Sequence, residues 1–464
     1  MARLSLVAAV VAVLAFAVPA RAATPQQFAF TASDGVALAC SLVVPDTPPP
    51  AGGYPGLMLF HGLGGRHEDL EPVATQFFAP AGYETLECDA RGHGGSGGTF
   101  GLDGPRDVQD VKELFAYLQS RTGNASIGAL GISLGGGAVW NAVTSGVPFK
   151  AIVPVITWTN LLGALAPQGL AKSGLVQYLA GLVPMSRWDP QLVAASQGLT
   201  TSLDLTGATA LAAVRAPTAR LRTIATPTFL VQGRHDFLFD IDQALVAYSR
   251  LKGPKRLYLG DVGHSPAPNP PAEVPAYSAE AVRWFDRYVK GTPNGIDKQP
   301  PIELAHDPYD GKPTAYRTLP ATKTLSVTLP GTTTMSGTSG KIVRSARLTG
   351  GPHETFGTST VVVRYSGAQR WDRLVAVLAV QGESTPITAG GVKLTASSGK
   401  VTIRLMNEAV RFPAGKRLVL YLGSTSLAQD PANGLYLAAV QPDAKITIGR
   451  VTLNVSVLKR AVSR

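Results

Sequence analysis

A serine, an aspartate and a histidine, residue types that together catalyse acyl transfer, follow one another along this chain, each after an apolar run. Residues 131–135 read Gly-Ile-Ser-Leu-Gly and place Ser133 between an apolar, strand-like run and a helix start of small residues. Asp236 and His264 each follow a later apolar run. An imidazole can take the proton of a serine nucleophile, and a carboxylate can orient the imidazole. The chain order of nucleophile, acid and base predicts a catalytic triad of Ser133, Asp236 and His264.

Acyl transfer also needs donors for the oxyanion that develops on the substrate. Residues 57–60 form a strand-like run that leads into the loop His61-Gly62-Leu63-Gly64-Gly65. We expect the backbone amides of Leu63 and Leu134 to form the oxyanion hole, because one lies after the third strand and the other follows the nucleophile. We interpret His61 as structural.

Two parts of this site have competing interpretations. Asp240, Asp242 and Asp261 lie near Asp236 in the sequence and are alternative acids, although each could instead cap a helix or lie at the surface. Four histidines are candidate metal ligands: His61, His67, His93 and His235. None of their pairs has the helical i, i+4 spacing or the Cys/His clustering of a zinc site, so we expect no metal and no cofactor.

The length and composition agree with an enzyme. The 464 residues exceed what one hydrophobic core usually organises, which indicates two domains or one enlarged domain. The net charge of +11 comes from scattered Lys and Arg residues without a basic run, so a nucleic-acid partner is not expected. The oligomeric state is left open.

The first 22 residues have the pattern of a secretory signal peptide. Arg3 precedes the apolar stretch from Leu4 to Val18, and Ala20-Arg21-Ala22 is a small-residue cleavage site. We expect a secreted protein whose mature chain starts near Ala23, with an uncleaved anchor as the alternative. An exported chain permits a disulfide between Cys40 and Cys88, but two buried thiols remain equally open.

The periodicity of apolar residues divides the chain into regions. Strands alternate with helices over 23–156 and 226–291, which predicts a parallel sheet and an α/β-hydrolase domain. Residues 157–225 interrupt the alternation as a helical cap. A linker is expected over 292–318 and a β-sandwich over 319–464. The sandwich strands are expected at 325–329, 361–365, 374–380, 401–405, 418–422, 435–440 and 451–458.

The cap follows the sixth strand, which places it over the mouth where Ser133 emerges. We therefore expect its large apolar residues to line the substrate pocket. The candidates are Trp158, Leu161, Leu162, Met185 and Trp188. The cap contains only two carboxylates, Asp189 and Asp204, so an apolar acyl or aryl group fits it better than a peptide with a free amino terminus.

The chain resembles the X-Pro dipeptidyl-peptidase and cocaine-esterase-like hydrolases over nearly all of its mature length. The resemblance is carried by GISLGGG at 131–137, DARGHGGSGG at 89–98, GRHD ending at Asp236, GHS at 263–265 and FPAGKRL at 412–418. It implies an α/β-hydrolase core with a helical cap, followed by a jelly-roll, galactose-binding-like sandwich. The family often has Tyr after the nucleophile and a Tyr hydroxyl in the oxyanion hole. Leu134 and the loop around Leu63 depart from this pattern, so the resemblance does not select peptides over esters.

These observations predict a secreted serine hydrolase that cleaves an ester, or a peptide or amide bond, of a small substrate through an acyl-enzyme. The alternatives are an X-Pro-type dipeptidyl-peptidase, an acyltransferase in which an alcohol replaces water, and a catalytically silent binding protein.

Overall fold

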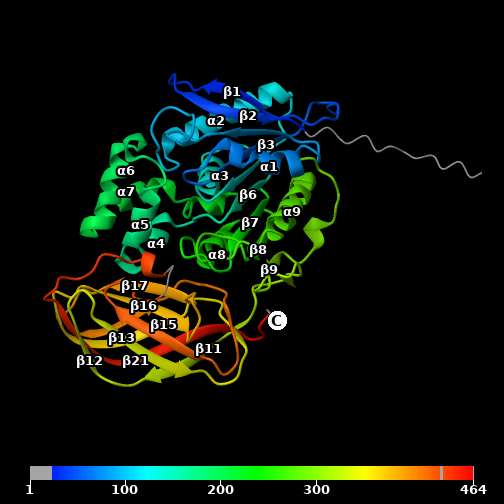
Figure 1. Cartoon of the computed structure of the whole chain (residues 1–464). Helices are drawn as coiled ribbons and strands as arrows, with labels where there is room; N and C mark the ends of the chain where they lie inside the picture. Colours follow the sequence, from blue (N-terminus) through cyan, green and yellow to red (C-terminus); the bar gives the residue numbers. More distant parts are fainter. Residues whose placement is uncertain (1–22, 429–431, 463–464) are drawn as a thin grey trace, which may run out of the picture.

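The computed structural model describes residues 23–428 and 432–462; the predicted signal peptide, residues 1–22, lies outside them. The described chain forms an α/β domain and, below it in Figure 1, a β-sandwich. The fold class predicted from the sequence is therefore confirmed.

A ten-stranded sheet forms the centre of the α/β domain, in the order β1-β2-β4-β3-β5-β6-β7-β8-β9-β10. The first hairpin is antiparallel, β2 pairs with β4 antiparallel, and the strands from β4 to β9 run parallel. The strands are β1 Gln26–Thr31, β2 Ala37–Val43, β3 Gly56–Phe60, β4 Glu84–Cys88, β5 Ile127–Ile132, β6 Ile152–Val155, β7 Thr228–Gly233, β8 Lys255–Gly260, β9 Ile302–Leu304 and β10 Thr314–Tyr316. The central strands read as continuous apolar runs because both faces of the sheet are covered.

Helices cover the two faces of this sheet (Figure 1). The main ones are α2 Pro105–Thr122, α3 Leu134–Thr144, α8 Ile241–Arg250 and α9 Glu273–Tyr288, with the short α1 Glu71–Val73. One core cluster joins side chains of α2, α3 and α8 to the sheet, and a second joins those of α9 to the other face. The amphipathic spacing seen in the sequence over α2 and α9 therefore marks their buried sides.

The insertion between β6 and β7 folds as helices and short turns, where the sequence predicts the cap. Its helices are α4 Leu161–Leu165, α5 Ser173–Ala180, α6 Pro190–Gln197 and α7 Thr206–Arg215. Their apolar sides form a cluster that also includes Leu134, the residue after the proposed nucleophile.

The predicted linker over 292–318 requires a correction. β9 pairs parallel with β8, and β10 pairs antiparallel with β9, so this segment extends the hydrolase sheet. Each of the two strands has only three residues, which is too short for a strand periodicity to show in the sequence.

The C-terminal region forms two antiparallel sheets of a sandwich, in the orders β11-β21-β15-β18 (with β12 on β21) and β13-β20-β16-β17. Its strands are β11 Thr322–Leu329, β12 Thr333–Ser336, β13 Lys341–Arg347, β14 His353–Glu354, β15 Thr360–Gln369, β16 Arg373–Val380, β17 Thr388–Lys393, β18 Gly399–Arg404, β19 Arg411–Phe412, β20 Arg417–Gly423 and β21 Lys445–Leu458. The strand predicted at 435–440 is wrong. That segment is irregular and runs against the cap, where Leu437 N–H and Ala438 N–H donate to Ser173 Oγ.

Cys40 and Cys88 form a disulfide between β2 and β4, where they are directly opposed in the antiparallel register. The question left open by the sequence is thus decided by strand pairing.

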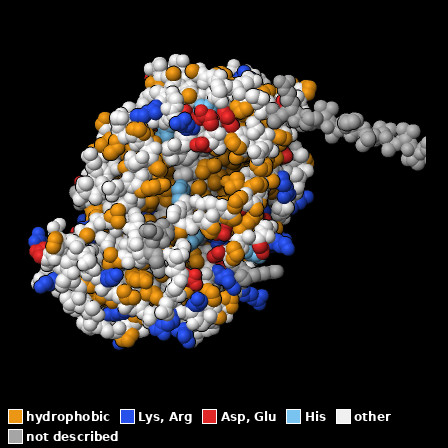
Figure 2. Space-filling model, viewed as in Figure 1, with side chains coloured by type: hydrophobic (Ala, Val, Ile, Leu, Met, Phe, Trp, Pro, Cys, Tyr) orange, Lys and Arg blue, Asp and Glu red, His pale blue; other side chains and the backbone are white. Residues whose placement is uncertain are grey.

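Within the described residues, no helix is long and apolar enough to cross a membrane. On the face in Figure 2, hydrophobic side chains occupy a broad area of the α/β domain, and Lys and Arg are scattered around it.

Candidate active site

Ser133 occupies a strained turn between β5 and α3. Its φ of 55° and ψ of −111° lie outside the regions that side-chain-bearing residues prefer. Three hydrogen bonds hold the turn: Ser133 N–H donates to Val155 O at 2.9 Å, and Thr157 Oγ1 and Gly137 N–H donate to Ser133 O. A Cβ on Gly131 would lie 2.1 Å from the carbonyl oxygen of Gly135, so the turn can close only over glycine. This geometry is that of a nucleophile elbow.

The structure brings the three predicted triad residues together. His264 Nε2 lies 2.9 Å from Ser133 Oγ, and His264 Nδ1 lies 2.9 Å from Asp236 Oδ2. Ser133, Asp236 and His264 follow β5, β7 and β8, whose carboxyl ends lie at one edge of the parallel sheet. The imidazole of His264 is therefore placed to accept the serine proton at one nitrogen while the other donates to a carboxylate.

Asp236 is a buried carboxylate with all its hydrogen bonds satisfied. Oδ1 accepts the amides of Leu238 and Phe239, and Oδ2 accepts the amide and ring of His264. Burial acts to raise the pKa of Asp236, but the charge and hydrogen bonds of His264 and the Phe239 amide outweigh it and hold the pKa below its usual value. The acid thus remains ionised at neutral pH, as orientation of the imidazole requires.

The alternative acids, Asp240, Asp242 and Asp261, are not paired with His264. Asp240 and Asp242 accept hydrogen bonds from the backbone and side chain of Asn407 in the sandwich. Burial, first, and the nearby Asp307 raise the pKa of Asp261 to about 7. Of these carboxylates, the structure pairs only Asp236 with His264.

The two predicted oxyanion donors lie beside the nucleophile. Leu63 lines the same cavity as Ser133, and Leu134 begins α3 directly after it. Within the described chain, the amides of Leu63 and Leu134 donate to no protein acceptor, and Gly62 lies close enough that a Cβ there would be 3.7 Å from Ser133 Cβ. Both N–H groups are therefore available to an oxyanion.

His61 holds the Leu63 loop in place. Its Nε2 accepts the amide of Ala90 at 2.9 Å, which leaves Nδ1 to donate to Gly62 O at 2.7 Å. Burial, partly opposed by the Gly62 hydrogen bond, lowers the pKa of His61, which favours this neutral tautomer. The structural interpretation of His61 made from the sequence agrees with these contacts.

A cavity of about 930 Å³ opens over Ser133 and His264, and we call it the catalytic cavity. Its other lining residues are Gly62, Leu63, Ile132, Ile156, Gly174, Leu175, Gln177, Tyr178, Leu179, Leu182, Phe237, Leu238, Ser265, Gly434, Leu435 and Leu437. None of them is Asp, Glu, Lys or Arg. The cap supplies one wall through α5, and the sandwich supplies another through residues 434–437.

The five cap residues expected in the substrate pocket do not line this cavity, which corrects the prediction. Trp158 is 2% exposed, and its indole N–H donates to Arg215 O. Met185 is 39% exposed on the surface. Leu161, Leu162 and Trp188 face a separate space inside the cap. The sequence showed that these residues were apolar, but not which side of each cap helix faces Ser133.

Sequence reasoning did not identify two parts of the lining of the catalytic cavity: α5 and the sandwich residues 434, 435 and 437. Leu175, Leu179 and Leu182 belong to the apolar pattern of the cap, but nothing local distinguishes them from their neighbours. Leu435 and Leu437 were assigned to a strand and came to the site only through packing of the sandwich on the cap.

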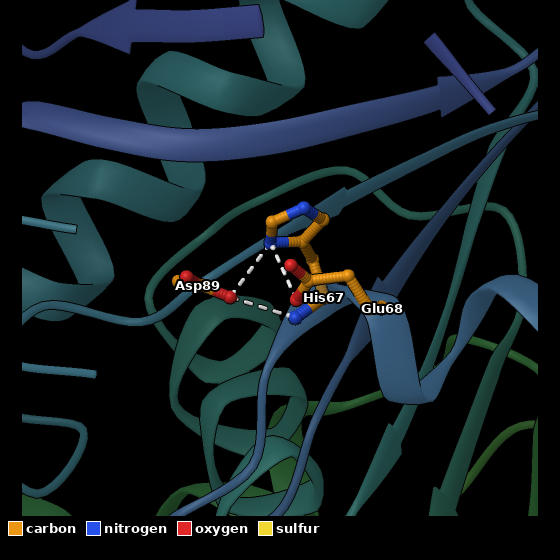
Figure 3. Close-up of side chains that lie close together, drawn as sticks. All are labelled: His67, Glu68 and Asp89. Atoms are coloured by element: carbon orange, nitrogen blue, oxygen red, sulfur yellow. Dashed lines mark hydrogen bonds and ion pairs between the residues drawn. The ribbon is translucent and has the colours of Figure 1, made fainter. Parts of the chain in front are cut away.

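One group in the described part of the chain has the composition of a metal site: His67, Glu68 and Asp89 (Figure 3). His67 Nδ1 lies 2.7 Å from Asp89 Oδ1, and its Nε2 lies 2.6 Å from Gln27 Oε1. Both ring nitrogens are thus engaged with protein partners. Asp89 also accepts the amides of His67 and Gly95, so the group fastens the loop after β4.

The sheet order, the cap and the Ser-His-Asp arrangement define the class of serine hydrolases with an α/β-hydrolase fold. The sequence profile of the X-Pro dipeptidyl-peptidase (S15 family) matches residues 34–266, and the chain belongs to this family.

Relatives carry both peptidase and esterase names. The chain is 28% identical, over 353 residues, to a Streptomyces avermitilis protein whose name places it among the Xaa-Pro dipeptidyl-peptidases; the match covers 70% of this chain and 50% of that protein. It is 26% identical over 215 residues to a carboxylesterase of Bacillus subtilis; this match covers 44% of this chain and 83% of that protein. The chain thus spans about half the length of the first relative and most of the second.

Solved structures with the same fold cover both domains. A CocE/NonD family hydrolase from Staphylococcus aureus matches with a TM-score of 0.69 at 13% identity, over 94% of each chain. An alpha-amino acid ester hydrolase matches with a TM-score of 0.70 at 15% identity, over 95% of this chain and 97% of the other. At these identities the likeness concerns the fold.

Proposed function

We propose that this protein is a secreted serine esterase that forms an acyl-enzyme on Ser133. The observation that carries the proposal is the pair of 2.9 Å contacts that join Ser133 Oγ, His264 and Asp236 in one line. The strained elbow and the two available amides support it, because a structural serine needs neither.

In the proposed reaction, Ser133 Oγ attacks the ester carbonyl carbon while its proton passes to His264 Nε2. The amides of Leu63 and Leu134 donate to the oxyanion, and Asp236 stabilises the imidazolium. Collapse of the intermediate breaks the bond to the alcohol oxygen, which takes the proton from His264. Water then repeats these steps on the acyl-enzyme and releases the acid.

The lining of the catalytic cavity favours an ester with an apolar acyl group. A dipeptide with a free amino terminus brings an ammonium group, which needs an acidic partner when it leaves water. The cavity lining includes no carboxylate side chain. The family and the relatives' names keep the X-Pro dipeptidyl-peptidase as the second candidate.

The test compares p-nitrophenyl butyrate with Gly-Pro and Ala-Pro p-nitroanilides in the wild type, Ser133→Ala and Ser145→Ala. We expect ester turnover that falls at least about a thousandfold in Ser133→Ala. Ser145, at the far end of α3, is the matched control and should retain activity. Serine-dependent anilide turnover in place of ester turnover would assign a dipeptidyl-peptidase, and transfer to an added alcohol in preference to water would assign an acyltransferase.

A wild-type protein that neither turns over these substrates nor reacts with a fluorophosphonate probe would point to a silent binding protein. Secretion is supported by the signal-like pattern of residues 1–22 and by the Cys40–Cys88 disulfide, a bond typical of exported proteins. Sequencing the amino terminus of protein recovered from the medium tests cleavage near Ala23.

A further inference from the structure

A second space lies inside the cap, next to the catalytic cavity. It has a volume of about 90 Å³, and we call it the cap cavity. It is enclosed by α4, α5, α6 and α7 together with the segment near Phe100. Among its lining residues only Ser196 carries a hydroxyl, and the indole N–H of Trp188 is engaged by Val183 O at 3.1 Å. A space of this composition accepts hydrocarbon better than water.

The cap cavity and the catalytic cavity share two walls, Leu63 and Leu179. Leu63 carries one of the proposed oxyanion donors, so the carbonyl oxygen of a bound substrate lies next to its backbone. The first carbons of the acyl chain, attached to the same carbonyl carbon, then lie within reach of the Leu63 side chain. Leu63 and Leu179 separate the two cavities, so a linear chain that passes between their side chains enters the cap.

We propose that the cap cavity binds the distal part of a linear acyl chain, so that the preferred substrates are esters of medium-chain fatty acids. This inference rests on the proposed function, because it needs an acyl group at Ser133. Leu161, Leu162 and Trp188 then contact the end of the chain, whereas the catalytic cavity holds the ester and the alcohol. A short acyl group leaves the cap cavity empty and forgoes that burial of apolar surface.

The experiment measures kcat/KM for p-nitrophenyl butyrate and octanoate in the wild type, Ala212→Phe, Ala208→Leu and Ala210→Phe. Ala208 and Ala212 line the cap cavity from α7, whereas Ala210 is on the exposed side of the same helix. Octanoate should be preferred by the wild type. The octanoate-to-butyrate ratio should fall at least about tenfold in Ala212→Phe and less in Ala208→Leu, and Ala210→Phe should keep the wild-type ratio.

The ratio is internal to each variant, so a smaller folded fraction cancels from it. Ala208→Leu adds less volume and serves where Ala212→Phe does not fold. A wild type that prefers butyrate, or a filled cavity that leaves the ratio unchanged, overturns the inference while Ser133-dependent butyrate turnover leaves the proposed function standing. Loss of the function itself shows differently, as absent turnover of both esters by the wild type.

Discussion

Two buried carboxyl groups of the α/β domain differ in charge because their neighbours differ. Asp236 receives four hydrogen bonds, including two from the base it orients, and its pKa is held low. Glu87, on β4, receives one from the Ser41 hydroxyl to Oε2, while Oε1 has no hydrogen-bond partner among the described residues. Burial raises the pKa of Glu87 to about 8. Asp236 is thus held in its ionised form at neutral pH, whereas Glu87 is buried in the sheet in its neutral form.

This difference predicts that Glu87→Gln changes how stability depends on pH. Between the ordinary pKa of 4.5 and the folded value of about 8, folded Glu87 keeps a proton that the unfolded chain has lost, so the free energy of unfolding falls as pH rises. Gln keeps an acceptor for Ser41 and cannot ionise. Urea unfolding should show the variant close to wild type at pH 5 and more stable by about 1 to 3 kcal/mol at pH 9.

Glu84→Gln is the control for that experiment, since Glu84 lies at the other end of β4 and is ion-paired with Arg121. Its loss should lower stability at both pH values. A Glu87→Gln variant that is less stable than wild type at pH 9 contradicts the assignment of a neutral Glu87.

Among the secondary-structure elements, the close contact of α3 with β3 and β5 sets the position of Ser133, the proposed nucleophile. A Cβ on Gly135 would lie 2.2 Å from the carbonyl oxygen of Phe60 at the end of β3. Because that oxygen belongs to the backbone of a buried strand, it cannot move aside as a flexible side chain would. The first turn of α3 must therefore be built from residues without side chains on that face.

Gly135→Ala should consequently displace α3 and with it the elbow. We expect kcat/KM for p-nitrophenyl butyrate to fall at least about a hundredfold, with a lower melting temperature, because small displacements of reacting groups have effects of this size. Gly207→Ala on α7 is the control, since its new Cβ would meet neighbours only at 3.5 Å. That variant should be unchanged or slightly more stable. Wild-type kinetics in Gly135→Ala would show that the elbow tolerates the shift.

The two domains meet around the segment that carries Asp236, the proposed catalytic acid. Arg234 is fully buried, pairs with Glu354 of the sandwich and donates to the carbonyl oxygen of Ala409. Glu408, also from the sandwich, accepts the amide of Asp236 at 2.9 Å, and its burial raises its pKa well above the usual value. From the cap, Lys172 Nζ donates to Phe237 O at 2.8 Å. The sandwich therefore helps to hold the backbone of the candidate active site in place.

This arrangement predicts a kinetic role for Glu408 as a positioning residue. Glu408→Ala leaves the Asp236 amide without its acceptor, and kcat for p-nitrophenyl butyrate should fall about tenfold or more while KM changes little. Glu408→Gln retains an accepting oxygen and should restore kcat to within about threefold. Equal losses in both variants, or a change confined to KM, would indicate that Glu408 acts on folding or on substrate binding instead.

The sequence by itself determined the features that depend on local chemistry. The glycines around Ser133, the apolar runs before Asp236 and His264, and the helical spacing over residues 105–122 each show their structural role within a few positions. The parallel sheet follows from the alternation of strands and helices. Because parallel strands run in the same direction, their carboxyl ends lie at one edge of the sheet.

The tertiary structure decided what depends on which surfaces meet. Trp158 and Met185 are large, mainly apolar residues of the same insertion as Leu175 and Leu179, yet the packing of the cap places only the last two of these four in the lining of the catalytic cavity. Leu435 is not in the predicted strand, because its backbone carbonyl instead accepts hydrogen bonds from amides at the start of α5. Such contacts join residues hundreds of positions apart. Their driving force, burial of apolar surface, is not directional, so a local sequence pattern does not show which apolar residue will pack against which distant surface.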